Sequence, residues 1–266
     1  MFEPAFMQLA LVASIATGAS LGIIGVYLVV RRVVFLGLVL ANAATVGAAA
    51  AEAFSWSPEI ASVSASVAAA LGLGLVQRPR RVSAESLMGW AYAAASSAPV
   101  LILATVAAPD ADTLHMLFGN LLAVSGSHVT GLVIVAVVIG LAHVLFTRRF
   151  LLVIFDAEGA QVAGVNARVW TLGLNLLVGV AAAAAVHEIG ALLTFALLTL
   201  PAMAALLVTT NMRATFITAA GLGALLPCLG LAVAFYADLP AGPASVALLS
   251  ISVLAAAAVG SVTSSR

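Results

Sequence analysis

Long apolar stretches recur along almost the whole chain, and they constrain the fold more than any other feature. Each is close to the roughly 20 residues that an α-helix needs to cross a bilayer. Only 8% of the residues are charged, so a water-soluble fold would lack polar cover. The sequence therefore predicts an all-α, polytopic membrane protein with one transmembrane domain over residues 1–266. The nine stretches are 5–30, 33–54, 59–76, 86–108, 129–147, 171–187, 189–209, 214–236 and 243–263.

The basic residues predict the orientation of these helices. The chain has no lysine, and with nine crossings all of its arginines fall on one side. That side is cytoplasmic by the positive-inside rule, which puts the N-terminus outside and the C-terminus in the cytoplasm. An even number of crossings would break the pattern. The arginines are Arg31, Arg32, Arg78, Arg80, Arg81, Arg148, Arg149, Arg168, Arg213 and Arg266.

The remaining charge is consistent with a membrane protein and argues against a nucleic-acid partner. The formal net charge is zero, so there is no basic surface for a phosphate backbone. Most acidic residues fall at or near the outer side, where they are either solvated loop residues or a mildly anionic mouth that favours a cation. These residues are Glu3, Glu52, Glu59, Asp110, Asp112, Glu188 and Asp238.

An outer connection at residues 109–128 is long enough to cover the bundle. Its middle, HMLFGNLLAV, is amphipathic but too short to span a membrane. We expect it to form an outer lid segment. His115 and His128 flank its core, either as ordinary surface histidines or as groups that receive a ligand.

A cytoplasmic connection carries the other distinctive segment, residues 151–168. Its pattern predicts a short helix over 156–163, because Asp156 and Glu158 suit the positive end of a helix dipole and Gly164 suits its C-terminus. The segment is either an ordinary amphipathic connector or a helix that accepts force from a soluble motor.

Several of these segments together resemble one family, the permease subunits of zinc and manganese ABC importers. The matching stretches occur in the family's order and cover nearly the whole chain. They are GIIGVYLVVRRVVFLGLVLANAATVGAA, LFGNLL, FDAEGAQVAGV, IGALLTFALLTLPAMAALL and DLPAGPASVALL.

The resemblance implies a multi-pass permease in the inner membrane of a prokaryote that works with other chains. It implies a second permease copy, identical or paralogous, two cytoplasmic ATPase subunits and an extracytoplasmic solute-binding protein. It also implies that Asp156, Glu158 and Gly164 belong to a coupling helix that docks on the ATPase. The chain has no phosphate-binding loop and no lysine, so we expect no cofactor on this chain, with ATP bound and hydrolysed on the separate ATPase.

The chain departs from the family at one motif. In the family, the second helix carries Gly-Asp-Ala-x-Ser-His-Ala, whose Asp and His lie one turn apart and suit a divalent cation. Here the matching positions hold Leu38 and Asn42. Leucine cannot bind a metal, and an amide oxygen is a weak ligand for zinc.

Three explanations remain open: ligands elsewhere in the chain, a partner permease that retains the motif, or a different solute. Ionisable groups near membrane depth are costly and usually functional, so His187 and Glu188 join Leu38 and Asn42 as candidates for the substrate pathway. Asn42, His187 and Glu188 are the candidate metal ligands, and a simple hairpin turn is the alternative for the latter two.

These observations predict a permease of an ATP-driven importer, most directly for zinc, manganese or iron. The alternative is a permease of the same family for a non-metal or chelated solute. An intramembrane enzyme is a remote alternative, because no helix carries paired catalytic groups, and so is a purely structural membrane protein.

Overall fold

The computed structural model describes residues 5–75, 82–105 and 126–264, and these residues form helices and short connections without any strand. The all-α fold class is therefore confirmed. The predicted lid at 109–128 lies almost wholly outside the described residues. The helices are α1 (Ala5–Val30), α2 (Val34–Phe54), α3 (Pro58–Leu75), α4 (Ala84–Leu103), α6 (Gly126–Phe155), α7 (Ala157–Val162), α8 (Ala167–Val208), α9 (Met212–Ala237) and α10 (Ala241–Ser264).

Eight of the described helices are long and apolar enough to cross a membrane, which confirms the multi-pass prediction. One of them, α8, has 42 residues. A straight helix of that length would reach about 63 Å, twice the thickness of the hydrocarbon core. It is interrupted at Gly190, whose φ of 79° and ψ of 163° are not helical.

The interruption lies at Gly190, and not at His187 and Glu188, where the sequence suggested a tight turn. Both residues belong to the last turn before the break. The reason is steric, because a positive φ costs glycine little and costs other residues more. The apolar stretch predicted at 129–147 is also longer in the structure. It belongs to α6, which continues through Arg148 and Arg149 to Phe155.

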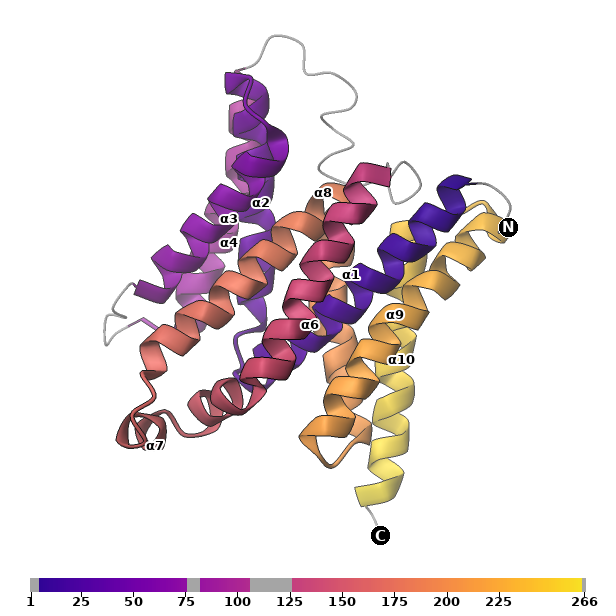
Figure 1. The fold of residues 1–266 in the computed structure, drawn as a ribbon. Helices are drawn as coiled ribbons and strands as arrows, with labels where there is room; N and C mark the ends of the chain where they lie inside the picture. The colour runs from indigo at the N-terminus through magenta and orange to yellow at the C-terminus, as the bar shows by residue number, and fades with distance from the viewer. Residues whose placement is uncertain (1–4, 76–81, 106–125, 265–266) are drawn as a thin grey trace.

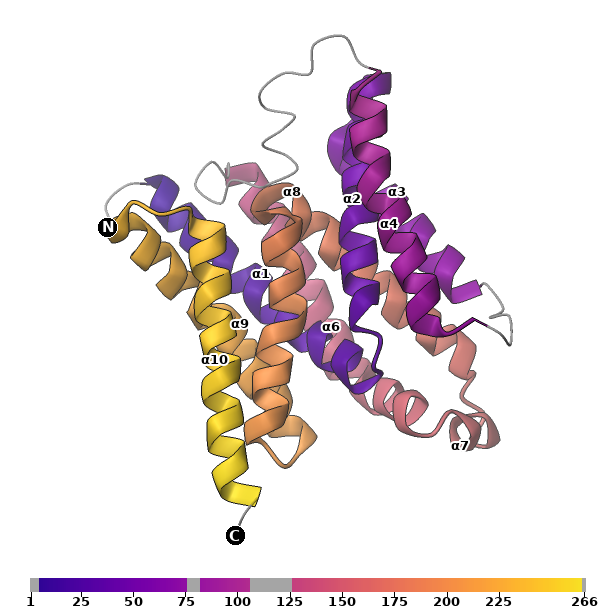
Figure 2. The ribbon, with the colours of Figure 1, turned by 180° about the vertical axis from the view of Figure 1, so that it is seen from behind.

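The helices form one bundle in which α1 and α8 lie between two groups (Figures 1 and 2). Helix α1 packs along α9, α8 and α6, whereas α2 packs against α3, α4 and α8. The connections between α1 and α2, between α6 and α8, and between α8 and α9 lie at the same end of the bundle, the lower end in Figure 1. The described arginines lie in or near these connections, namely Arg31 and Arg32 between α1 and α2, Arg148 and Arg149 near the end of α6, Arg168 at the start of α8 and Arg213 at the start of α9.

Small residues allow the helices to approach closely. A Cβ atom added at Gly18 in α1 would overlap the carbonyl of Gly223 in α9, and one added at Gly223 would overlap the carbonyl of Gly18. The buried Ser66 hydroxyl of α3 lies 3.0 Å from the carbonyl oxygens of both Leu40 and Gly179. Because lipid provides no hydrophobic force between helices, such close packing and polar contacts hold the bundle together.

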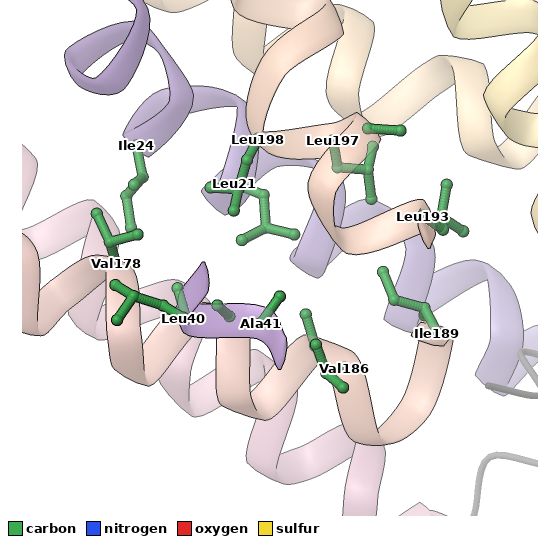
Figure 3. Close-up of a cluster of buried hydrophobic side chains, with 14 of the residues drawn as sticks. Leu21, Ile24, Leu40, Ala41, Val178, Val186, Ile189, Leu193, Leu197 and Leu198 are labelled. Atoms are coloured by element: carbon green, nitrogen blue, oxygen red, sulfur yellow. The ribbon is translucent and has the colours of Figure 1, made fainter. Parts of the chain in front are cut away.

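The largest apolar cluster surrounds the break in α8. Leu40 on α2 lies between the two segments of α8, with Val178 and Val186 on the first and Leu193 and Leu198 on the second (Figure 3). The two segments therefore enclose the middle of α2 from two sides. This arrangement places the end of the first segment, with His187 and Glu188, at the end of the bundle opposite to the arginines.

Candidate functional site

Leu38 and Asn42 lie one turn apart on a partly exposed face of α2, as their spacing predicts. The Asn42 amide nitrogen donates to the Leu38 carbonyl oxygen at 2.9 Å. Its amide oxygen accepts from the Ser96 hydroxyl of α4 at 3.4 Å. Both ends of the amide are thus engaged within α2 and with α4. The contact with α4 is long, and the Ser96 hydroxyl also donates to the Tyr92 carbonyl oxygen at 2.8 Å.

His187 and Glu188 instead line a pocket of about 230 Å³ between α3, α6 and α8. Two further ionisable residues line the same pocket: Glu59 in the first turn of α3 and His128 in the first turn of α6. The walls are otherwise mainly apolar. Four titratable side chains from three helices therefore meet at the end of the bundle opposite to the arginines.

His128 lies between the two carboxylates of this pocket. Its Nδ1 is 2.9 Å from Oε1 of Glu188, which is a hydrogen-bond distance. Its Nε2 is 4.0 Å from Oε1 of Glu59, which is an ion-pair distance. The Glu188 side chain is only 11% exposed, against 45% for His128. A carboxylate this buried is costly unless it is paired, and His128 supplies the partner.

The structure does not join all predicted ligands into one site. Within the described residues, no hydrogen bond or ion pair links Asn42 with His187 or Glu188, and no group of three or more His, Cys, Asp and Glu side chains is arranged to hold a metal ion. The structure does bring together Glu188 and His128, which the sequence places in separate segments. The sequence analysis identifies Glu59 only as an outer acidic residue. The prediction that Glu59 and Glu188 both lie on the outer side is the one sequence feature that could have linked them.

The short helix predicted at 156–163 is present as α7, residues Ala157–Val162. Asp156 is its N-cap, and its Oδ1 accepts from the Gly159 amide at 2.7 Å. At the other end, the Val165 amide donates to Ala160 at 2.8 Å and the Gly164 amide donates to Gln161 at 3.0 Å. These two bonds, with φ of 78° at Gly164, form a Schellman motif. Both ends of a very short helix are therefore capped.

Helix α7 has one anchored face and one open face. Ala160 is fully buried and packs with Val153 of α6 and Ala167 of α8. On the open side, Val162 is 90% exposed and the nearby Phe155 is 65% exposed. Exposed apolar side chains beside exposed carboxylates are typical of a surface that meets another protein.

An aromatic cluster connects the base of α7 with the rest of the bundle. The Tyr27 hydroxyl of α1 lies 2.8 Å from Nδ1 of His143 on α6. The Tyr27 ring also packs against Phe150 of α6 and Phe216 of α9, with centroids 5.5 and 4.9 Å apart. Trp170 at the start of α8 lies against Phe150 at 5.6 Å. These contacts join the ends of α6 and α8 that flank α7 to α1 and α9.

A family model described as "ABC 3 transport family" matches residues 3–260 of the chain. The chain belongs to this family. A manganese transport system membrane protein MntC of Listeria monocytogenes is 29% identical over 94% of this chain and 89% of the relative. A manganese import system permease protein ScaB of Streptococcus parasanguinis is 26% identical over 89% of this chain and 84% of the relative.

The fold has a solved counterpart. The structure of PsaBC from Streptococcus pneumoniae in complex with Fab superposes with a TM-score of 0.86, covering 96% of this chain and 91% of that one at 22% identity. Family membership and these relatives confirm that the chain is a membrane permease subunit and not an enzyme. In such systems the ATPase is a separate chain.

Proposed function

We propose that this chain is the permease of an ATP-driven importer that moves a divalent metal ion, namely manganese, zinc or iron, into the cell. The observation that carries the proposal is the full-length match to permeases named for manganese transport. Alternating access of the bundle is the mechanism that a two-sided permease of this family requires. The outer pocket with two carboxylates and two imidazoles supports a cationic substrate, because its field attracts positive charge.

The partners follow from the open surface of α7. We propose that a cytoplasmic ATPase subunit docks on it, with Asp156 and Gly164 holding the helix in shape and Glu158 offering a charge to the partner. The exposed Val162 supplies the apolar contact. A second permease copy, identical or paralogous, and an extracytoplasmic binding protein complete the proposed importer, with no cofactor on this chain and ATP on the ATPase.

The proposed topology has nine crossings, with α8 counted as two spans that meet at Gly190. The N-terminus is then outside and the C-terminus in the cytoplasm of a prokaryotic cell, and the permease lies in the inner membrane. The connections between α1 and α2, between α6 and α8 and between α8 and α9 meet at one end of the bundle (Figure 1), and the described arginines lie in or near them, which supports this count. It puts α7 in the cytoplasm and the pocket at Glu188 on the outer side.

In this chain Leu38 and Asn42 replace the Asp and His of the family motif on α2. This replacement favours a transport pathway in which the two positions on α2 form a gate but do not bind the metal. We propose that Leu38 and Asn42 line the pathway and that His187 and Glu188 supply its ionisable groups. A paralogous partner that retains the motif is the alternative within the same importer.

A second candidate function is import of a chelated or non-metal solute by the same mechanism. It is favoured by the residues at the helix 2 position, because Leu38 offers no ligand atom and the neutral amide oxygen of Asn42 is a weak ligand for a transition metal. The two functions differ in the form of the cargo and not in the machinery.

The test is uptake into proteoliposomes that contain the chain with its ATPase and binding protein. Radioactive Mn²⁺, Zn²⁺ or Fe²⁺ should accumulate in the proteoliposomes only with ATP. Replacing the ATPase by a variant that cannot hydrolyse ATP should abolish this accumulation. Accumulation of a metal only as its chelate would support the second function. Absence of ATP-dependent uptake for free and chelated metals would refute metal import.

A further inference from the structure

We propose that His128 and Glu188 form a transient divalent-cation site in the outer pocket, with Glu59 orienting the imidazole. This inference rests on the proposed function as a metal importer. It assigns the receiving site to the meeting point of α3, α6 and α8, and not to the helix 2 motif. The cargo ion is thus expected to bind first where two carboxylates and two imidazoles converge.

The spacing of the two ligand atoms suits a shared ion. Nδ1 of His128 and Oε1 of Glu188 are 2.9 Å apart. Adjacent ligand atoms on a divalent first-row metal are about 3 Å apart, because each bond is about 2.1 Å long and the angles lie near 90–110°. The pair therefore needs little movement to replace the hydrogen bond by two metal–ligand bonds.

The second carboxylate stands where it can orient the imidazole. Metal-ligating histidines usually present their other ring nitrogen to a carboxylate, which fixes the tautomer and raises the basicity of the ligating nitrogen. Nε2 of His128 lies 4.0 Å from Oε1 of Glu59, an ion-pair distance that a small movement of either side chain would shorten to a hydrogen bond. When Nδ1 binds the ion, the ring proton is carried on Nε2 towards Glu59. His187 lines the same pocket.

The site is built for passage and not for retention. Only two protein ligands hold the ion in this arrangement, and the described residues contain no group of three or more such side chains arranged for metal. Water completes the shell of such an ion. Sites on a transport path must bind strongly enough to load and weakly enough to release, and a small number of protein ligands favours release.

The test measures Mn²⁺ binding to the detergent-solubilised complex of the chain with its ATPase, from the loss of the free-ion signal in electron paramagnetic resonance. We expect Glu188→Gln and His128→Ala each to weaken binding at least tenfold. Glu59→Gln should weaken it about tenfold, as expected for loss of an orienting partner. Glu188→Asp keeps a carboxylate and should restore most of the affinity.

The matched control is Glu52→Gln, an exposed carboxylate at the end of α2 that does not line the pocket, and it should bind as the wild type does. Thermal unfolding of each variant separates loss of the site from loss of the fold. Equal Mn²⁺ affinity in Glu188→Gln, His128→Ala and wild type would overturn the inference even when the wild-type complex imports metal. Failure of wild-type import in proteoliposomes would instead overturn the proposed function.

Discussion

The cap at the end of α7 offers the sharpest test of how this permease is coupled to its motor. Gly164 has φ of 78°, a conformation that costs an L-residue with a Cβ atom about 1–2 kcal/mol. A six-residue helix has little stability of its own. The cost at Gly164 therefore directly destabilises the capped conformation of α7. Since 1.4 kcal/mol is a factor of ten, Gly164→Ala should lower the equilibrium constant between the capped and the uncapped helix by about 5-fold to 30-fold.

The assay is ATP-dependent metal uptake by proteoliposomes, together with binding of the ATPase to the permease. We expect both to fall in Gly164→Ala, by this factor at most, and to fall further in Gly164→Val, whose branched side chain tolerates positive φ least. Gly164→Asn should lie between wild type and Gly164→Ala, because asparagine accepts this conformation at helix ends.

The control is Gly173→Ala in the nearby part of α8. A Cβ atom there would meet no atom within 4 Å, and alanine is favoured over glycine inside a helix. Uptake should therefore be unchanged. Wild-type uptake in Gly164→Ala, or an equal loss in Gly173→Ala, would refute the role given to the capped helix.

Three further predictions concern the bundle and its polar contacts. Gly18→Leu should destabilise the protein by about 3 kcal/mol in thermal unfolding in detergent, because the new side chain would overlap the backbone of α9. In the control Gly221→Ala the added Cβ atom meets no atom within 4 Å, so the unfolding midpoint should not change. Equal unfolding midpoints for the two variants would contradict the close packing at Gly18. Tyr27→Phe should cost about 1 kcal/mol in the same assay, because it removes the hydroxyl at His143; an unchanged midpoint would show that this contact contributes nothing. Asn42→Ala should leave Mn²⁺ affinity within twofold of wild type, because Asn42 does not line the pocket that holds His128 and Glu188. A tenfold loss would place Asn42 among the ligands.

Much of the fold could be predicted because hydropathy records membrane depth directly. The structure has helices at Ala5–Val30, Val34–Phe54 and Met212–Ala237, within two residues of the predicted stretches. The break in α8 was misplaced for a physical reason. His187 and Glu188 form a polar pair that suggests a turn, but in the structure both are helical and line a pocket. The chain changes direction two residues later, at Gly190, because the change needs a positive φ.

The site was less predictable because its members are distant in the sequence. Glu188 was identified as unusual from its position alone, but its partner His128 belongs to another helix, and the segment between them folds back before they meet. Glu59 is contributed by a third helix. By contrast, Asp156 and Gly164 cap a single short helix. Their spacing in the sequence was enough to predict that they lie at its two ends.

The location of α7 tests the account most directly, because docking of an ATPase requires it to lie in the cytoplasm. Cys228 is the only cysteine of the chain, so Cys228→Ala provides a background for single cysteines. Val162→Cys, at a position 90% exposed, and Trp56→Cys, at one 62% exposed, would be labelled in cells with a membrane-impermeant maleimide. We predict that Trp56→Cys reacts in intact cells, where the reagent reaches only the outer side of the membrane. Val162→Cys should react only after the membrane has been permeabilised. Labelling of Val162→Cys before the membrane is opened would contradict the account.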